Sequence, residues 1–327
     1  MIDTNAVPDT RPPLPVVAIS GPTAAGKSEL AMALCLALPE GGEVVSVDSA
    51  QIYRGMDIGS AKPDLEARTR VPHHLIDILD PVEPYSAARF ADDAAAAIAD
   101  IRSRGRIPVL VGGTLLYHRA LFEGLNDLPP ADPALRLRLE AELLRIGVEA
   151  QHARLAEVDP ITATRLHPND SQRVQRALEI HAVTGRPASA WHAEPKPGGR
   201  VPGTVLRYAV MPPAKAVFDT RIAQRFRQMI AAGFVDEVAR LRARGDLDLG
   251  LPSMRAVGYR QLWSHLDGDC SLNEAVRLGV IATRQYAKRQ MTWLRSDRSW
   301  SWIDAAEPAA LLGVLNAVES SQTLLGR

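Results

Sequence analysis

The fold is decided by one stretch, Gly21-Pro22-Thr23-Ala24-Ala25-Gly26-Lys27-Ser28, which fits the pattern G-x-x-x-x-G-K-[ST]. An apolar run over residues 15–20 precedes it and predicts a buried strand, and residues 29–38 follow with a helical pattern. The two glycines let successive backbone N–H groups approach one phosphate, Lys27 adds a positive charge, and Ser28 offers a hydroxyl to Mg²⁺. We therefore predict a phosphate-binding loop over the whole stretch, with a chance match in a glycine-rich turn as the alternative.

The composition is that of a globular chain, with 327 residues, 46% hydrophobic content and a formal net charge of zero. This balance argues against a protein coated in basic residues for indiscriminate nucleic-acid binding, although local basic clusters stay possible. Residues 1–13 carry charges and prolines without an apolar segment, so we expect a disordered tail and no secretion signal. No apolar run predicts a membrane span, and Cys35 and Cys270 make neither a disulfide framework nor a metal site. We expect a cytoplasmic protein.

Two further strands are predicted at residues 43–47 and 106–111, with a helix over residues 86–104 between them. Strands that alternate with helices predict an α/β fold with a doubly wound parallel sheet. Asp48 directly follows the second strand, and Gly112-Gly113-Thr114 follows the third. Both segments should reach the carboxyl edge of the sheet, where open α/β proteins bind ligands. Asp48 is therefore a site candidate, and a helix cap or turn carboxylate is the alternative.

His73 and His74 invite a metal-site interpretation, which we do not favour. Residues 73–78 are predicted as a short strand, on which neighbouring side chains point to opposite faces and cannot easily share a metal ion. No other Cys or His cluster completes a coordination set. We interpret both histidines as structural.

The domain organisation changes near the middle of the chain. Residues 14–126 form the first part of the phosphate-loop core, and residues 127–203 are helical stretches broken by prolines, which predicts a helical insertion domain. A strand over residues 204–210 returns to the core, whose second part, residues 204–327, ends in basic helices.

Basic residues with aromatic neighbours suggest a nucleic-acid surface. Arg173 and Arg176 share a face of a helix in the insertion, and Arg284, Lys288 and Arg295 fall at helical spacing on the last long helix. Tyr286, Arg289 and Trp293 lie on a neighbouring face of that helix. Such interleaving suits a nucleic-acid backbone and unstacked bases, and a solvated or salt-bridged surface is the alternative.

Three functions fit these residues. The loop could hold ATP while Asp48 activates a hydroxyl of a small acceptor, which makes a metabolite kinase. It could instead hold pyrophosphate as a leaving group, with a nucleic acid as the acceptor. A non-catalytic, nucleotide-gated RNA-binding protein is the third class. The chain length, the insertion and the basic-aromatic last helix favour the second.

The sequence resembles the tRNA dimethylallyltransferases of the bacterial type, without the zinc-finger extension of the eukaryotic relatives. The matching motifs are residues 21–28, 48–63, 72–77, 110–114, 167–170 with Gln172 and Arg173, 257–261 and 282–295. They cover the chain in order apart from its two tails. The long stretches that begin at Asp48 and Ala282 discriminate far better than the phosphate loop does.

The resemblance implies transfer of a dimethylallyl group from dimethylallyl diphosphate to the exocyclic N6 amine of the adenosine beside the anticodon of tRNA, with Mg²⁺ as cofactor. It implies Asp48 as the general base, and Thr23, Lys27 and Arg221 at the diphosphate, with Ser28 on the metal. Arg221 matches a short pattern whose neighbouring family acid is Ala214 here. The expected partners are the donor and the tRNA anticodon stem-loop, with no membrane, and the chain is expected to be a monomer.

The resemblance also implies a set of residues that contact tRNA. They are Asp48, Ser49, Ala50, Gln51, Thr114, Arg136, Gln172, Arg173, Val174, Gln175, Arg176, Arg255, Gly258, Tyr259, Arg260, Lys288, Arg289, Trp293 and Arg295.

Overall fold

The computed structural model describes residues 13–325 and divides the chain into two compact units. We call residues 1–122 with 199–327 the core unit and residues 123–198 the insertion unit. Of the predicted tail, residues 1–12 lie outside the described part. Each unit has its own buried cluster of apolar side chains, so each is considered by itself.

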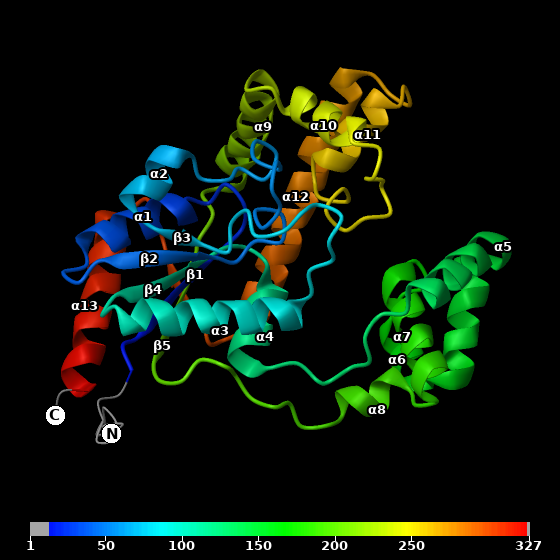
Figure 1. The fold of residues 1–327 in the computed structure, drawn as a ribbon, viewed down its shortest axis with the longest axis horizontal. Helices are drawn as coiled ribbons and strands as arrows, with labels where there is room; N and C mark the ends of the chain where they lie inside the picture. Colours follow the sequence, from blue (N-terminus) through cyan, green and yellow to red (C-terminus); the bar gives the residue numbers. More distant parts are fainter. Residues whose placement is uncertain (1–12, 326–327) are drawn as a thin grey trace, which may run out of the picture. The chain divides into compact units, whose positions relative to one another are not determined.

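The core unit contains a six-stranded sheet in the order β3-β2-β4-β1-β5-β6 (Figure 1). All five strand pairings are parallel, which confirms the predicted α/β fold. The strands are β1 (Val16–Ser20), β2 (Gly42–Ser46), β3 (His73–His74), β4 (Ile107–Val111), β5 (Val205–Val210) and β6 (Ser301–Ile303). The two central strands β1 and β4 are buried along their whole length, as expected of strands that helices cover on both faces.

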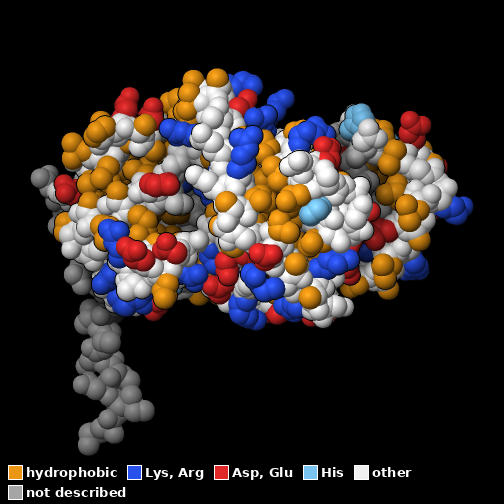
Figure 2. All heavy atoms as spheres, turned by 90° about the horizontal axis from the view of Figure 1, so that it is seen from above, with side chains coloured by type: hydrophobic (Ala, Val, Ile, Leu, Met, Phe, Trp, Pro, Cys, Tyr) orange, Lys and Arg blue, Asp and Glu red, His pale blue; other side chains and the backbone are white. Residues whose placement is uncertain are grey.

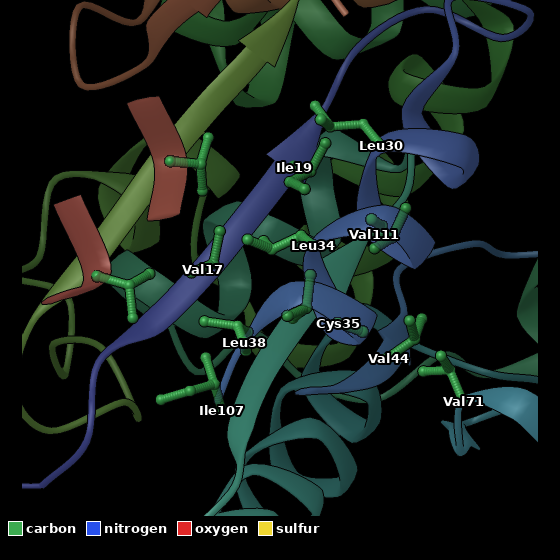
Figure 3. Close-up of a cluster of buried hydrophobic side chains, with 14 of the residues drawn as sticks. Val17, Ile19, Leu30, Leu34, Cys35, Leu38, Val44, Val71, Ile107 and Val111 are labelled. Atoms are coloured by element: carbon green, nitrogen blue, oxygen red, sulfur yellow. The ribbon is translucent and has the colours of Figure 1, made fainter. Parts of the chain in front are cut away.

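Helices α1 (Lys27–Ala37) and α13 (Pro308–Leu325) belong to one layer (Figure 1). Figure 3 shows side chains of α1, among them Leu30 and Leu34, interleaved with Val17 and Ile19 of β1. Burial of a leucine of this kind contributes about 1.5–3 kcal/mol. This packing fixes α1, and with it the loop that α1 follows, against the end of β1.

Helices α3 (Ala87–Ser103) and α4 (Leu115–Glu123) also belong to the core unit, and α3 contacts β2 and β4. Ser86 caps α3 by accepting a hydrogen bond from the backbone N–H of Arg89, at 3.1 Å. The ring of Phe90 on α3 stacks on Tyr117 of α4 at 4.4 Å between centroids. The two helices therefore pack on one another as well as on the rest of the core.

A second cluster of the core unit involves α9 (Lys215–Ala231), α10 (Phe234–Ala243), α11 (Tyr259–Leu266) and α12 (Leu272–Ser296). Within it, the buried Glu237 of α10 accepts hydrogen bonds from three successive backbone N–H groups of residues 57–59 and from the hydroxyl of Tyr259. One carboxylate thereby ties the loop that follows β2 to the carboxyl-terminal helices.

The insertion unit consists of α5 (Pro133–Val158), α6 (Pro160–Arg165), α7 (Ser171–Thr184) and α8 (Ala188–His192). Its core is formed by Leu139, Leu155, Val174 and Ile180 with their neighbours. Helix α5 is interrupted at Gly147, whose φ of 81° is a left-handed conformation that glycine adopts readily.

The region after β2 differs from the predicted strand over residues 73–78. Strand β3 is only two residues long, because Leu75 and Asp77 have positive φ angles of 61° and 57° and the chain cannot continue as a strand. Asp77 is held there by Lys62 and Arg68, at 2.5 and 2.8 Å. Helix α2 (Leu65–Arg70) also lies in this region, and the sequence pattern did not predict it.

The two histidines have structural partners. His74 Nε2 lies 2.7 Å from the buried carboxylate of Glu43, and His73 Nδ1 lies 2.7 Å from the carbonyl oxygen of Val71. No described helix is long and apolar enough to cross a membrane.

Candidate active site

The anion loop, residues 21–28, connects β1 to α1 and ends at a helix start that no side chain caps. Gly26 is the N-cap of α1 with a φ of 93°, and no side chain caps the helix. A Cβ on Gly21 would lie 3.0 Å from the carbonyl oxygen of Val210, so this position is closely packed. The uncapped start of α1 therefore offers backbone N–H groups and the positive end of a helix dipole to an anion.

Lys27 is the charged group of this loop. Its Nζ donates a hydrogen bond to the carbonyl oxygen of Pro22 at 2.8 Å. Burial lowers the pKa of Lys27 to about 8, while the charge of Asp48 acts in the opposite direction. A nearby anion stabilises the protonated form of a desolvated lysine. The ammonium group of Lys27 is therefore suited to binding a phosphate oxygen.

A cavity of about 1120 Å³ opens at the carboxyl edge of the sheet, and both Lys27 and Asp48 line it. Parallel pairing explains their meeting, because Ser46 of β2 and Ile19 of β1 both lie opposite Val111 of β4. Asp48 follows the end of β2 closely, and Lys27 lies at the far end of the anion loop that follows β1. An anion site and a carboxylate thus share one cavity.

Asp48 is held by its own loop. Its Oδ1 accepts hydrogen bonds from the backbone N–H groups of Ala50 and Gln51, at 2.8 and 3.3 Å. Thr114 supports the same segment, since its hydroxyl oxygen accepts from the backbone N–H of Ser49 at 3.2 Å. Oδ2 has no hydrogen-bond partner among residues 13–325, so one carboxylate oxygen is available to accept a proton.

Helix α9 adds polar side chains to the cavity, including one arginine that we did not predict. Arg221 and Arg225 both line it, and Arg225 acts on Lys27 by lowering its pKa. The two arginines are four residues apart and therefore share a helix face. That spacing was the signal in the sequence.

Tyr286 of α12 is another unpredicted member of the cavity wall. Burial raises its pKa to about 12, and the neighbouring charge of Asp48 raises it as well. Tyr286 therefore stays protonated at neutral pH and presents an aromatic ring and a hydroxyl beside the carboxylate.

The donor set suits a Mg²⁺ ion shared with a phosphate. No described group of three or more His, Cys, Asp or Glu residues forms a metal cage. The hydroxyl of Ser28 and the carboxylate of Asp48 do line the cavity beside the anion loop. Mg²⁺ commonly uses only one or two protein oxygens and completes its shell with substrate phosphates and water. The residues present fit this ion.

The predicted RNA-binding residues of the core unit divide by exposure. Those with exposed side chains are Ser49, Arg255, Arg260, Lys288, Arg289, Trp293 and Arg295. Tyr259 is fully buried and bonded to Glu237, and Gly258 is buried too, so both are packed inside the core unit and their contact with tRNA stays a prediction. Figure 2 shows basic and acidic side chains interspersed, so a polyanion must depend on local groups.

Helix α12 carries five basic residues, of which Arg277 pairs with Glu274 and Arg284 with Asp219. The other three are Lys288, Arg289 and Arg295. None of the three has a carboxylate partner within residues 13–325, and Arg289 packs on the ring of Tyr286 at 5.8 Å from its centroid. Their charges are therefore not neutralised within the described part of the chain.

In the insertion unit the predicted arginines are paired. Arg136 and Arg176 both bond to the buried Glu179, and Arg173 pairs with Asp170. Val174 is buried in the core of this unit, and its contact with tRNA stays a prediction. Gln172 is exposed and Gln175 is partly buried on the same helix.

The sequence matches the family model described as IPP transferase over residues 51–297. It is 60% identical over 281 residues to a tRNA dimethylallyltransferase of Halorhodospira halophila, covering 86% of this chain and 90% of that one. It is 52% identical over 320 residues to a tRNA dimethylallyltransferase of Burkholderia multivorans, with 97% and 96% covered. These matches support neither the metabolite kinase nor the non-catalytic RNA-binding protein.

Solved structures agree. A tRNA isopentenylpyrophosphate transferase of Bacillus halodurans has a TM-score of 0.67 at 38% identity, with 95% of this chain and 97% of that one covered. A eukaryotic dimethylallyltransferase acting on tRNA has a TM-score of 0.71 at 29% identity, with 89% and 74% covered. Taken with the sheet, the anion loop and the family match, these likenesses mean that the chain belongs to the tRNA dimethylallyltransferase family.

Proposed function

We propose that this enzyme transfers a dimethylallyl group from dimethylallyl diphosphate to the N6 amine of the adenosine beside the anticodon of tRNA and releases diphosphate. The observation that supports the proposal most strongly is the common cavity of Lys27 and Asp48. It provides an anion site for the leaving group and a proton acceptor for the nucleophile. Action as a monomer in the cytoplasm stays a prediction.

The anion loop would bind the diphosphate of the donor. Gly26, Lys27 and Ser28 line the cavity, and so do Thr23 of the loop and Arg221 of α9. As the bond from the allylic carbon to oxygen breaks, its electron pair stays on the diphosphate. Fixed positive groups that stabilise this growing charge lower the barrier.

Asp48 would act as the general base. The exocyclic amine of adenine is a poor nucleophile, since its lone pair is delocalised into the ring, and it must lose a proton as the new bond to carbon forms. The free Oδ2 of Asp48 can accept that proton while Oδ1 stays bonded to the loop backbone. The adenine must be held outside its stack to reach this carboxylate.

Ser28 would hold the Mg²⁺ ion at the edge of the anion loop, and the diphosphate and water would complete its ligands. When bound, the metal neutralises charge on the diphosphate and orients it.

The tRNA would bind to the core unit through Lys288, Arg289, Trp293 and Arg295 of α12, together with Arg255 and Arg260. Their exposure and the unpaired charges of α12 support this assignment. Gln51 lines the cavity, and we propose that it meets the flipped adenosine together with the adjoining Ser49, Ala50 and Thr114. From the insertion unit we propose contacts by Gln172, Arg173 and Gln175, with Arg136 and Arg176 positioned by Glu179.

The test measures transfer of radiolabel from dimethylallyl diphosphate to unmodified tRNA in the presence of Mg²⁺. We expect labelled N6-modified adenosine from the unaltered chain, and a single-turnover rate lower by about 10²–10⁴-fold in Asp48→Asn, with tRNA affinity unchanged. Asp269→Asn is the matched control, because Asp269 is exposed and has no side-chain partner among the described residues.

Three outcomes would contradict the proposal. Product from AMP without tRNA would point to a free nucleotide as the acceptor. Release of ADP from ATP would point to a kinase. An unchanged rate in Asp48→Asn would remove Asp48 as the base while leaving the transfer itself intact.

A further inference from the structure

Gln290 differs from its neighbours on α12 because it is buried. It is 4% exposed, and both polar atoms of its side chain bond to the backbone of other segments. Oε1 accepts from the N–H of Thr23 at 3.1 Å, and Nε2 donates to the carbonyl oxygen of Gly113 at 2.9 Å. A primary amide can accept at one end and donate at the other, which an apolar side chain of the same size cannot do.

The two partners belong to the two halves of the site. Thr23 lies in the anion loop, and Gly113 lies in the turn after β4. Residues of that turn hold the segment of Asp48, since the N–H of Thr114 donates to the carbonyl oxygen of Val47 at 3.2 Å. The hydroxyl oxygen of Thr114 accepts from Ser49 in addition. The amide of Gln290 thus lies between the diphosphate side and the proton-acceptor side.

The turn at Gly112 and Gly113 is packed closely against both Gln290 and the segment that ends at Asp48. A Cβ on Gly113 would lie 2.0 Å from Nε2 of Gln290, and one on Gly112 would lie 2.0 Å from the carbonyl oxygen of Val47. Real Cβ contacts of this length do not occur, so the two glycines allow the anion loop, the turn and α12 to pack together closely.

We propose that Gln290 is a positioning residue that sets the separation between the anion loop and Asp48. This inference rests on the proposed function, in which those two groups act on one substrate pair. Gln290 also lies between Lys288 and Trp293 on the same helix, so a helix that presents exposed groups to RNA also contacts the donor loop directly. Gln290 therefore contributes to reaction geometry and not to RNA contact.

The test compares Gln290→Leu and Gln290→Glu with Gln285→Leu, an exposed glutamine on the same helix, as the matched control. For each variant we would measure the thermal midpoint, the Kd of inorganic diphosphate, the Kd of tRNA, and the single-turnover rate at saturating donor and tRNA. For Gln290→Leu we expect a rate lower by about 10–100-fold with an unchanged tRNA Kd, because misplacement by about 1 Å costs that much. Gln285→Leu should match the unaltered chain.

Gln290→Glu supplies a readout that a purely structural role would not produce. A carboxylate repels the carbonyl oxygen of Gly113, whereas a protonated carboxyl donates to it and still accepts from Thr23. We expect its saturated rate, relative to the unaltered chain at the same pH, to rise as the pH falls from 8 to 5.5, with tRNA Kd constant. This variant is nearly isosteric and keeps the test valid if Gln290→Leu fails to fold.

A saturated rate within twofold of the unaltered chain in folded Gln290→Leu would overturn the inference. So would a defect that lies entirely in the Kd of diphosphate and disappears at saturation, because it would assign Gln290 to loop folding alone. If the unaltered chain transfers no label to tRNA, the proposed function fails and the positioning role fails with it. A rate defect confined to the Gln290 variants leaves the proposed function standing.

Discussion

Three basic residues of α12, Lys288, Arg289 and Arg295, differ from Arg136, Arg173 and Arg176 of the insertion unit in how their charges are compensated. Arg136 and Arg176 share the carboxylate of Glu179, whose side chain is only 1% exposed, and Arg173 meets Asp170. Lys288, Arg289 and Arg295 have no such partner within the described residues. From sequence alone the two sets are alike, since each is a group of cations at helical spacing. The comparison teaches that a carboxylate partner within the protein distinguishes a structural cation from one that is available to an external anion.

Among the cations, the largest effect is expected at Lys27 of the anion loop, which like Lys288, Arg289 and Arg295 has no ion-pair partner among the described residues. Lys27→Met should lower diphosphate affinity and the single-turnover rate by about 10²–10³-fold, because one preorganised charge on the leaving group is lost. Calorimetry with diphosphate and the label-transfer assay would measure both. Normal affinity would show that the amides of the loop are sufficient.

In the insertion unit, loss of the Glu179 carboxylate should lower the free energy of unfolding. Burial alone raises the pKa of Glu179, but hydrogen bonds from Arg176 and Arg136 outweigh it and lower the pKa. Its contribution is therefore present above the usual carboxyl pKa and is lost as the pH falls through the lower folded value. Glu179→Gln should reduce the free energy of unfolding of this unit by about 2–3 kcal/mol, less than for a fully buried pair because both arginines reach solvent.

Hydrogen exchange resolved over residues 123–198 would measure this change. Glu157→Gln is the control, since Glu157 is exposed on α5 without a side-chain partner among the described residues. Equal protection in both variants would show that the Glu179 cluster does not stabilise the unit, and the contrast with α12 would then lose its basis.

Diphosphate binding should depend on pH through Lys27. Its pKa of about 8 means that the free enzyme loses this charge as the pH rises, while a bound anion favours the protonated form. Binding therefore takes up a proton, and affinity should fall by about tenfold between pH 7 and pH 9. The same titration on Lys27→Met corrects for ionisation of the diphosphate, and identical profiles would exclude Lys27 as the cause.

The smallest effects compare the two sets of cations directly. Lys288→Ala should weaken tRNA binding by about three- to tenfold and reduce the salt slope by about one, because a phosphate contact is lost. Arg173→Ala should weaken tRNA binding by only about twofold. An exposed ion pair such as Arg173 with Asp170 is worth about 0–1 kcal/mol, and losing it offsets part of the free energy of a new contact with phosphate. Filter binding at several salt concentrations would measure both, and a reversed order would overturn the comparison.

The sequence predicts the parts of the site that are local. The strand, loop and helix around Lys27 and the position of Asp48 after β2 follow from motif and alternation. Strand β6 is not evident because three residues carry too little periodicity. Helix α2 is also short, at six residues.

The remainder depends on contacts between distant segments. Gln290 matched a motif of RNA-binding residues, yet it bonds to Thr23, which is 267 positions earlier. Glu179 and Arg136 are 43 positions apart. No pattern within a helix indicates which carboxylate will meet which cation. The buried Tyr259 illustrates the same limit. Its hydroxyl donates a hydrogen bond to Glu237, which is not one of its neighbours in the sequence.

The attachment of residues 57–59 to Glu237 has a consequence for biosynthesis. The carboxylate comes 180 positions after Asp57, so a ribosome releases the loop long before the group that anchors it exists. Until then three successive amides lack their acceptor, and the nascent chain should be susceptible there to chaperones and proteases. We therefore expect the loop to reach its active conformation only after Glu237 has been translated.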